Sequence, residues 1–222
     1  MPKKPRSQDE MESAKSRILE CSLSVLAEKG FEGLSMREVA RRMGVVVGTL
    51  YGYYRNRDDL YLAVLTRGFE RLYDRFLKIP ASPGQPLENL AAMAGAYLDF
   101  GLEEPHFYNI MFTWHVPKFR DYLNTPMEQA ARVELETALA VYRLVLDQID
   151  GLLAETELSS TEDNRYWAIF FWSTLHGYVA GLNNTLLNYM HDKPLNLKER
   201  FLETLLASIH LGLSRLGAEK GL

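Results

Sequence analysis

Residues 35–57, SMREVARRMGVVVGTLYGYYRNR, hold the pattern that decides the fold of this chain. Ser35 can start a helix through a capping box, because its hydroxyl can accept from the Glu38 amide while the Glu38 carboxylate reaches back to the Ser35 amide. Gly44 stands where that helix must end, since the left-handed backbone after a helix is easiest for glycine. A second short helix follows. The stretch therefore predicts a helix-turn-helix, the unit that places one helix in the DNA major groove.

The side chains of this motif divide into an apolar set and an outward-facing set. The apolar set, spaced to close a small core, comprises Val39, Ala40, Met43, Val45, Leu50 and Tyr54. The outward set comprises Arg37, Val47, Thr49, Tyr51 and Tyr53. Tyrosine and threonine hydroxyls beside arginines are unusual on a plain solvated face, and they suit contacts with phosphates and base edges.

The same region resembles a known family. From Gly44 to Leu60 the chain reads G-V-x-x-G-T-L-Y-x-Y-Y-x-N-R-x-x-L, which is similar to the recognition-helix signature of TetR-type bacterial transcriptional regulators. The preceding A-x-x-G-F-x-G-L-S-M-R-E-V-A-x-x-M, from Ala27 to Met43, also fits the DNA-binding domain of that family. A weaker resemblance covers FWSTLHG at 171–177 and YLDFGLEEPHFY at 97–108, which look like the ligand-binding domain of a TetR subgroup with a Trp/His-Gly motif.

The resemblance implies a set of DNA contacts. It places Arg37 and Thr49 at base edges, with Val47 and Gly48 leading the helix into the groove. The implied phosphate contacts are Ser35, Tyr51, Tyr53 and Arg57. One departure is that Val46 and Val47 stand where many relatives have a serine or another polar residue. The missing helix cap costs about 1 kcal/mol, and a valine at position 47 can only meet a thymine methyl or fill space.

Length and composition predict a globular chain with one large or two modest cores. The chain has 222 residues, of which 47% are hydrophobic and 11% aromatic. The single cysteine, Cys21, excludes an internal disulfide, and its place on an apolar stripe favours a buried structural thiol over a redox sensor. The charged start has no apolar run behind it, and the apolar stretch 168–182 is shorter than the ~20 residues that span a bilayer. We expect a cytoplasmic protein with no membrane partner.

The net charge of −4 hides an uneven distribution. Residues 1–57 carry eleven Lys and Arg against seven Asp and Glu, whereas residues 58–222 carry fourteen against twenty-two. The basic part suits phosphate and the acidic part does not. Lys3, Lys4 and Arg6 can form an arm that reaches the minor groove or a solubilising terminus, and the sequence favours neither.

Helical periodicity runs through the chain, without the sustained alternation that indicates a sheet. Beside the two helices of the motif, we expect helices at 9–29, 56–79, 87–103, 126–155, 161–188 and 197–216, with a broken aromatic segment at 105–122. Ser160 with Asp163, and Asn196 with Glu199, read as start signals of the last two helices. The clear linker is PASPGQP at 80–86. The prediction is an all-α fold, with a DNA-binding domain at 1–57 and a ligand-binding and dimerisation bundle at 58–222.

Aromatic residues concentrate in the second part of the chain. Rings in such number can form a solid bundle core or line an adaptable cavity, and the family resemblance favours the cavity, since relatives bind small apolar effectors there. His115 and His176 are the polar groups best suited to orient such a ligand, although a structural role is open for each. The candidate ligand contacts are Tyr97, Phe100, Phe107, Met111, Phe112, Trp114, His115, Phe171, Trp172 and His176.

No enzyme emerges from the sequence. The histidines, at 106, 115, 176, 191 and 210, show no pair at the spacing of metal ligands, so no metal site or cofactor is predicted. The Gly-x-x-x-Gly sequences lie inside the helix-turn-helix and follow no strand, so they do not predict a phosphate-binding loop.

The last two predicted helices carry wide apolar stripes, which predict a homodimer through a four-helix interface. The alternative is that both stripes are core within one chain. The stripe residues are Phe201, Leu202, Leu205, Leu206, Ile209, Leu213 and Leu216, with Trp172, Tyr178, Val179, Leu182 and Leu186, and with Gly177 and Gly181 for close approach.

The sequence thus predicts a homodimeric transcriptional repressor that binds a double-stranded DNA operator and is released by a small apolar effector. Two alternatives stay open: a ligand-independent DNA-binding regulator or activator, and a small-molecule-binding helical bundle without DNA affinity.

Overall fold

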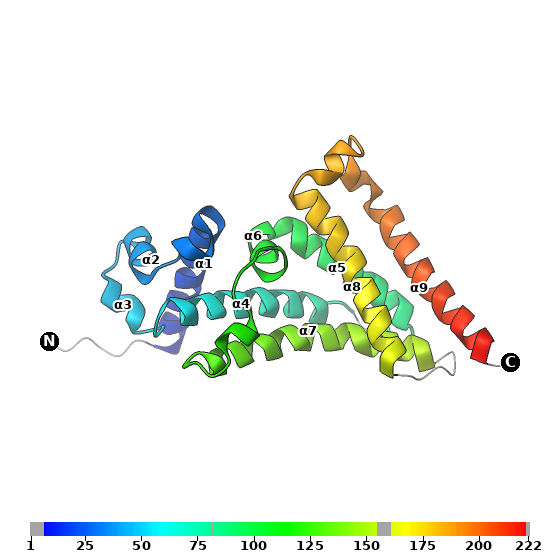
Figure 1. The fold of residues 1–222 in the computed structure, drawn as a ribbon, viewed down its shortest axis with the longest axis horizontal. Helices are drawn as coiled ribbons and strands as arrows, with labels where there is room; N and C mark the ends of the chain where they lie inside the picture. The colour runs from blue at the N-terminus through cyan, green and yellow to red at the C-terminus, as the bar shows by residue number, and fades with distance from the viewer. Residues whose placement is uncertain (1–6, 81, 155–160, 221–222) are drawn as a thin grey trace. The chain divides into compact units, whose positions relative to one another are not determined.

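The computed structural model describes residues 7–80, 82–154 and 161–220, with only the backbone described at 161–163 and 214–220. Every regular element in these residues is helical, which confirms the predicted all-α class (Figure 1). In chain order the elements are α1 (Gln8–Gly33), α2 (Met36–Met43), α3 (Val47–Tyr51), α4 (Arg57–Leu77), α5 (Pro86–Glu103), α6 (Pro105–Tyr108), the π-helical turn η1 (Asn109–Thr113), the 3₁₀ turn η2 (Phe119–Tyr122), α7 (Glu128–Ala154), α8 (Thr161–Asn183), the 3₁₀ turns η3 (Leu186–Tyr189) and η4 (Pro194–Leu197), and α9 (Lys198–Lys220).

Several helix ends differ from the prediction for local reasons. The first helix continues to Gly33 but is broken at Gly30, whose φ of 67° and ψ of −175° are not helical. α8 ends at Asn183, and the chain then turns so that Leu187 packs on Gly181, where an added Cβ would lie 2.8 Å from the leucine Cγ. Asn196 does not cap α9, because it lies inside η4, which leads directly into α9. Ser160 lies outside the described residues.

The chain divides into two compact units, residues 1–70 with 106–138 and residues 71–105 with 139–222. α4 and α7 therefore each contribute residues to both units. The domains expected from the sequence, 1–57 and 58–222, divide the chain differently and stay a prediction.

The first unit adds the segment from α6 to η2 to the helix-turn-helix. Gly68 of α4 lets this segment approach, because an added Cβ there would lie 2.5 Å from the Met111 Sδ. The rings of Phe69 and Phe112 meet edge to face at 5.6 Å. The hydroxyl of Tyr61, a fully buried residue, donates to the Pro117 carbonyl at 2.9 Å. These contacts fix the first half of α4 against residues 107–117.

The second unit packs α5 against α8 and α9, and Figure 1 shows α8 and α9 side by side, joined by η3 and η4. Trp167 of α8 lies over Gly212 of α9, where any Cβ would collide with the indole at 2.1 Å. Tyr178 stacks on Phe201 with ring centroids 4.2 Å apart, and its hydroxyl donates to the Pro194 carbonyl. Close packing therefore joins α8 and α9 within one chain.

Candidate nucleic-acid interface

The turn that presents α3 is built as the sequence predicts. The hydroxyl of Ser35 accepts from the Glu38 amide at 3.1 Å and so caps α2. Gly44 ends α2 in the left-handed conformation, with φ 66° and ψ 31°. Val39 and Leu50 are fully buried beneath the turn. The backbone here positions α3 as a short helix with one buried side.

The second half of the predicted capping box is wrong. The Glu38 carboxylate does not accept a hydrogen bond from the Ser35 amide. It accepts instead from Arg41, Lys29 and Arg42, each at 2.9 to 3.0 Å. These three donors, Arg41 first, hold the pKa of Glu38 well below its usual range. Arg42 also bonds to Glu28 of α1. The network ties α2 to α1.

The predicted DNA contacts lie on this motif with different exposure. Ser35, Arg37, Gly48 and Tyr51 are exposed, with Tyr51 at 56%, whereas Val47, Thr49, Tyr53 and Arg57 are half-buried. All eight belong to the first compact unit.

The arginines of the motif differ in their partners. Arg41 and Arg42 pair with Glu38, and Arg55 pairs with Asp59. Arg37 makes no ion pair with any described residue and stays exposed. A guanidinium with no competing carboxylate has its full hydrogen-bonding capacity left for a base edge or a phosphate. Arg37 is therefore the arginine of α2 best able to contact a partner.

Arg57, at the first position of α4, is held over an aromatic ring. Its guanidinium carbon lies 4.4 Å from the centre of the Phe31 ring, and nitrogens of the group lie 3.6 Å from Glu32 and from Asp58. The edge of Phe31 in turn meets Tyr61 at 4.8 Å. Cation–π contact restricts the orientation of the guanidinium without neutralising it.

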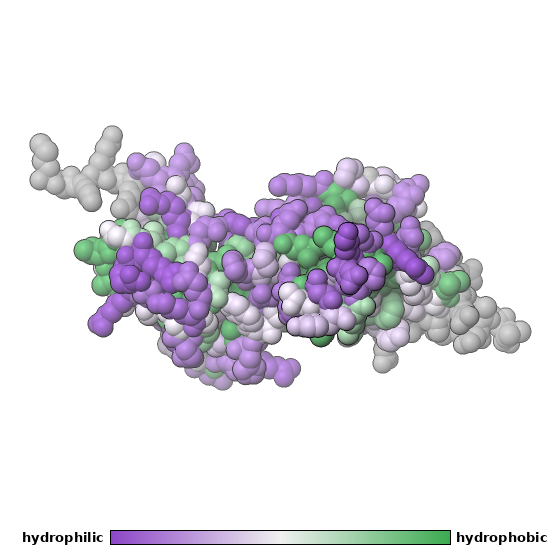
Figure 2. All heavy atoms as spheres, turned by 90° about the horizontal axis from the view of Figure 1, so that it is seen from above, coloured by the Kyte–Doolittle hydropathy of each residue, from purple (hydrophilic) through white to green (hydrophobic). Residues whose placement is uncertain are grey.

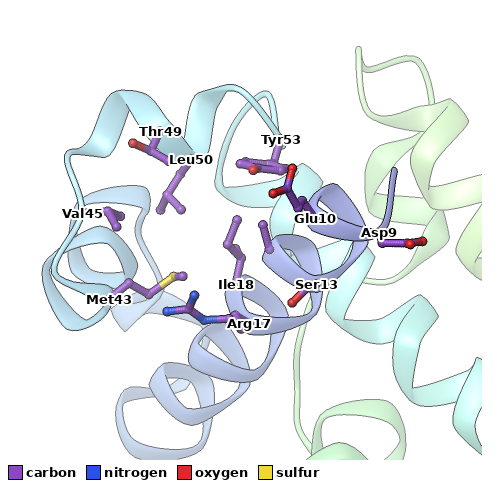
Figure 3. A pocket seen from close by; sticks show the side chains of 11 residues that line it. Asp9, Glu10, Ser13, Arg17, Ile18, Met43, Val45, Thr49, Leu50 and Tyr53 are labelled. Atoms are coloured by element: carbon purple, nitrogen blue, oxygen red, sulfur yellow. The ribbon is translucent and has the colours of Figure 1, made fainter. Parts of the chain in front are cut away.

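An open cavity of about 530 Å³ separates α3 from the start of α1. Figure 3 shows Thr49, Leu50 and Tyr53 on one side of it and Glu10, Ser13 and Arg17 on the other. The carboxylate of Glu10 accepts from the Ser7 amide at 2.8 Å and so caps α1. The carboxylates of Asp9 and Glu10 line this groove together with Tyr53, so a phosphate bound by Tyr53 must approach from outside the groove.

The candidate ligand contacts fall in both compact units. In the first unit, Phe107 and Met111 are buried, Phe112 and Trp114 are half-buried, and His115 is exposed. In the second unit, Tyr97, Phe100 and Phe171 are fully buried, while Trp172 and His176 are half-buried.

Two residues of the second-unit group, Tyr97 and Trp172, are in ring contact. The rings of Tyr97 and Trp172 lie 4.9 Å apart, which joins α5 to α8. Burial lowers the pKa of His176, so its neutral form is favoured. A neutral imidazole beside aromatic rings can orient an apolar molecule through one hydrogen bond.

The first unit also buries a carboxylate that sequence reasoning missed. Glu134 of α7 is 8% exposed, and burial raises its pKa to about 7. Its electrostatic partner is Lys118, whose Nζ donates to the Met111 carbonyl at 3.1 Å and whose pKa is lowered by burial. The hydroxyl of Tyr122 is buried nearby with no hydrogen-bond partner in the structure. Only the fold brings these groups together, because sixteen residues separate the pair in sequence.

Many residues of the predicted dimer stripes are buried within their own chain instead of being exposed to a partner. Leu205, Ile209 and Leu213 of α9, and Tyr178 and Val179 of α8, are buried within the chain itself, so they are not available to a partner. Gly181 is covered by Leu187 of the same chain. Phe201, Leu202, Leu206, Trp172 and Leu182 are half-buried, Gly177 and Leu186 are exposed, and the side chain of Leu216 is not described.

A different side of α8 and α9, called the outer face below, is left open. On α8 it consists of Tyr166, Ile169, Ser173 and Gly177, and on α9 of Thr204, Ser208 and Leu211. Both sets recur every three or four residues, so each occupies one side of its helix. Ile169 is 62% exposed and Leu211 is 59% exposed. These two side chains can be buried only if another surface covers the outer face.

Cys21 is half-buried, and its thiol lies 3.9 Å from the Val39 carbonyl. Burial raises the pKa of the thiol, which disfavours the reactive thiolate. No helix of the described chain is long and apolar enough to cross a membrane.

Known proteins share this sequence and fold. A model of bacterial regulatory proteins of the tetR family matches residues 18–64, and a model of the tetracyclin repressor-like C-terminal domain matches residues 90–208. The HTH-type transcriptional repressor KstR of Mycolicibacterium smegmatis is 36% identical over 81 residues, which are 36% of this chain and 40% of KstR. The chain thus matches about two fifths of the length of that relative.

Two further comparisons reach beyond the first domain. The HTH-type transcriptional activator FasR of M. smegmatis is 26% identical over 164 residues, which are 69% of this chain and 71% of FasR. The crystal structure of FadR from Bacillus subtilis in complex with stearoyl-CoA superposes with a TM-score of 0.64 at 17% identity, over 88% of this chain and 99% of that one, which shows the same fold. The C-terminal family model alone covers more than half of the chain. The chain therefore belongs to the TetR family, whose members are transcriptional regulators rather than enzymes.

Proposed function

We propose that the chain is a transcriptional repressor that reads a double-stranded DNA operator with α3. The observation that carries the proposal is the open face of the helix-turn-helix. Tyr51 lies exposed there with Arg37, which has no ion pair to any described residue, beside a helix positioned by the Gly44 turn. Groove readers place the start of such a helix against base edges. The family model that matches residues 18–64 covers this part of the chain, and the similarity to the repressor KstR supports the proposal.

Each contact residue has a proposed role. Arg37 and Thr49 meet base edges, and Val47 and Gly48 bring the helix backbone into the groove. Four side chains bind phosphates: Ser35, Tyr51, Tyr53 and Arg57. The arginine fork suits guanine, whereas hydroxyl groups suit phosphate oxygens.

Selection from a pool of random DNA duplexes, followed by gel shift, tests the proposal. The triple variant Tyr51→Ala, Tyr53→Ala, Arg57→Ala should lose operator binding while keeping its melting temperature within a few degrees. Tyr189→Ala is the matched control, because Tyr189 is 88% exposed and lies in η3, far along the chain from the motif. Unchanged affinity of the triple variant overturns the assignment, and a chain that selects no duplex leaves the alternative of a small-molecule-binding bundle.

We infer that the chain acts as a homodimer through the outer face of α8 and α9. One helix-turn-helix makes few contacts, and two-fold dimers meet half-sites about 34 Å apart. Tyr166, Ile169 and Leu211 supply apolar area at one end of this face, while Ser173 and Gly177 let another helix approach closely. Trp167 and Gly212, the neighbours of Tyr166 and Leu211 in sequence, pack against each other, which supports a face made by both helices.

We further propose that a small, mostly apolar effector releases the operator. The support is the aromatic cluster of Tyr97, Trp172 and neutral His176 in the second unit. α4 carries Arg57 in the first unit and ends in the second, where Arg75 pairs with Glu103 at 2.8 Å, so one helix contributes to both functions. The contacts predicted in the first unit, Phe107, Met111, Phe112, Trp114 and His115, stay a separate prediction.

A panel of apolar compounds tests the effector. A true effector raises the melting temperature and lowers operator affinity, and a coupling of about 1–3 kcal/mol changes that affinity about 5- to 150-fold. Ala96→Trp on α5 should block the response. If no compound does both, the ligand-independent alternative replaces this part of the proposal. Because FasR is an activator, a reporter gene behind the selected operator decides the sign of control.

A further inference from the structure

Val46 is the most exposed large apolar side chain in the part of the chain that matches the helix-turn-helix family model, at 75% exposure. It precedes α3 with an extended backbone, φ −72° and ψ 141°, and makes no side-chain cap hydrogen bond. Serine, threonine, aspartate or asparagine at this position caps a helix and stays hydrated. The chain therefore gives up a cap and exposes an isopropyl group at the same position. Neither feature helps the free protein.

The surroundings of Val46 are open. At Gly48, one residue into α3, a Cβ would find no heavy atom within 4 Å. Val47 is half-buried, so Val46 is the valine of the pair that projects into solvent. Figure 2 shows apolar atoms gathered at the left end of the view, where Figure 1 places the turn between α2 and α3. An approaching surface would meet Val46 first.

We propose that Val46 is a specificity-determining residue that contacts the C5 methyl of a thymine in each operator half-site. The inference rests on the proposed function. The first residues of a recognition helix meet base edges, and the thymine methyl is the apolar group that the major groove offers there. An isopropyl group has no donor or acceptor, so it gains nothing from a phosphate or from a polar base edge.

A thymine-to-uracil scan of the selected operator tests this contact, because deoxyuridine keeps the pairing with adenine and lacks only the methyl. At one thymine per half-site, the wild-type chain should lose affinity about fourfold, the effect of removing one buried methyl-sized group from an apolar contact. Val46→Ala should bind the thymine and uracil duplexes equally. Val133→Ala is the matched control and should keep the wild-type preference, because Val133 is an exposed valine of α7 outside the helix-turn-helix.

Cytosine supplies a second test of the same contact. With the base pair changed to one that carries cytosine, the duplex with 5-methylcytosine should bind the wild-type chain better than the unmethylated one, because both bases present a methyl at the same place. Val46 is exposed, so its substitution should leave the melting temperature of the free chain no lower.

The inference is overturned if every thymine of the operator tolerates uracil, or if Val46→Ala keeps the preference. Either result leaves the proposed function standing, since operator binding is measured in the same titrations. A chain that selects no duplex overturns both the proposed function and this inference.

Discussion

The turn before α3 and the outer face of α8 and α9 both expose apolar side chains, but their surroundings differ. Val46 and Tyr51 lie on a motif that also exposes Arg37, which has no ion pair within the described residues. Ile169 and Leu211 lie on the outer face, whose other residues are Tyr166, Ser173, Gly177, Thr204 and Ser208, none of them charged. An apolar group on the same motif as an arginine without an ion pair suits a charged, grooved partner, whereas an apolar face with small residues suits another helix. Exposure alone would not have separated these two surfaces.

The interiors behind these surfaces differ as well. Apart from tyrosines, the buried polar or charged side chains of the described chain are Ser22 and Glu134, and both lie in the first unit. The second unit buries aromatic rings such as Tyr97, Phe100 and Phe171. A buried carboxylate makes stability depend on pH, and an aromatic core does not. The stability of the unit that carries the proposed DNA contacts should therefore depend more strongly on pH than that of the second unit.

The largest effect is expected from charged substitutions that disrupt dimerisation through the outer face. Ile169→Glu with Leu211→Glu should give a monomer in sedimentation, because a dimer would bury four carboxylates without partners. Operator affinity should fall by about 100-fold or more, since the two half-sites are no longer bound together. Tyr189→Glu is the matched control and should stay dimeric, since Tyr189 is exposed outside this face.

A persistent dimer in the double variant would place the interface elsewhere. Ile209→Glu gives the opposite signature, because Ile209 is fully buried within the chain. Its carboxylate should unfold the protomer rather than separate two folded ones.

The next effect concerns the pH dependence of the first unit. Burial raises the pKa of Glu134 from 4.5 to about 7, so the folded chain holds a proton that the unfolded chain has lost. This contribution to stability is fully present below pH 4.5 and is lost as the pH rises through 7, by up to about 3 kcal/mol. Glu134→Gln should therefore stabilise the chain at pH 8 and have little effect at pH 4.5.

Urea unfolding at the two pH values measures the difference. Glu136→Gln, on the same helix but exposed, should leave the pH profile of the wild type unchanged. An identical profile for Glu134→Gln would mean that Lys118 neutralises the buried carboxylate in the folded chain.

A smaller effect separates base reading from phosphate binding within the motif. Arg37→Ala should cost about 1–3 kcal/mol at one base pair and nothing at the others. Arg57→Ala should weaken all sequences alike and flatten the salt dependence by about one unit of slope. Titrations of the operator and of its single-base variants at several salt concentrations measure both. If Arg37→Ala lost the same affinity for every duplex, Arg37 would contact a phosphate rather than a base.

Local signals made the helix-turn-helix predictable from sequence. Gly44 has the left-handed conformation and Ser35 the cap that their residue types predict, because each depends on neighbours within four residues. The carboxylate of Glu38 was mispredicted because its strongest partners include Lys29 of another helix. Ion pairs between helices leave no periodic signal in a sequence.

The second unit was less predictable for the same reason. An apolar stripe shows that one side of α9 is buried, but not whether the burying surface belongs to the same chain. Leu205 and Ile209 of the predicted stripe are buried in the core of the same chain. Leu211, which is not part of that stripe, is exposed. Likewise, the sequence pattern indicates Val47 as a contact to a thymine methyl, whereas Val46 is the more exposed of the two valines in the structure. Which of two adjacent valines projects depends on how α3 packs on its neighbours.

The smallest expected effect sets stability against recognition at one residue. Val46→Ser supplies the missing cap of α3, so the free chain should gain about 0.5–1 kcal/mol in urea unfolding. The same change removes the isopropyl group, so the preference for thymine over uracil should disappear. Val47→Ser is the control, since its side chain is half-buried inside the helix and caps nothing. A variant that gains stability and keeps the preference would show that the exposed valine serves neither role, and that the contrast between α3 and the outer face rests on Arg37 and Tyr51 alone.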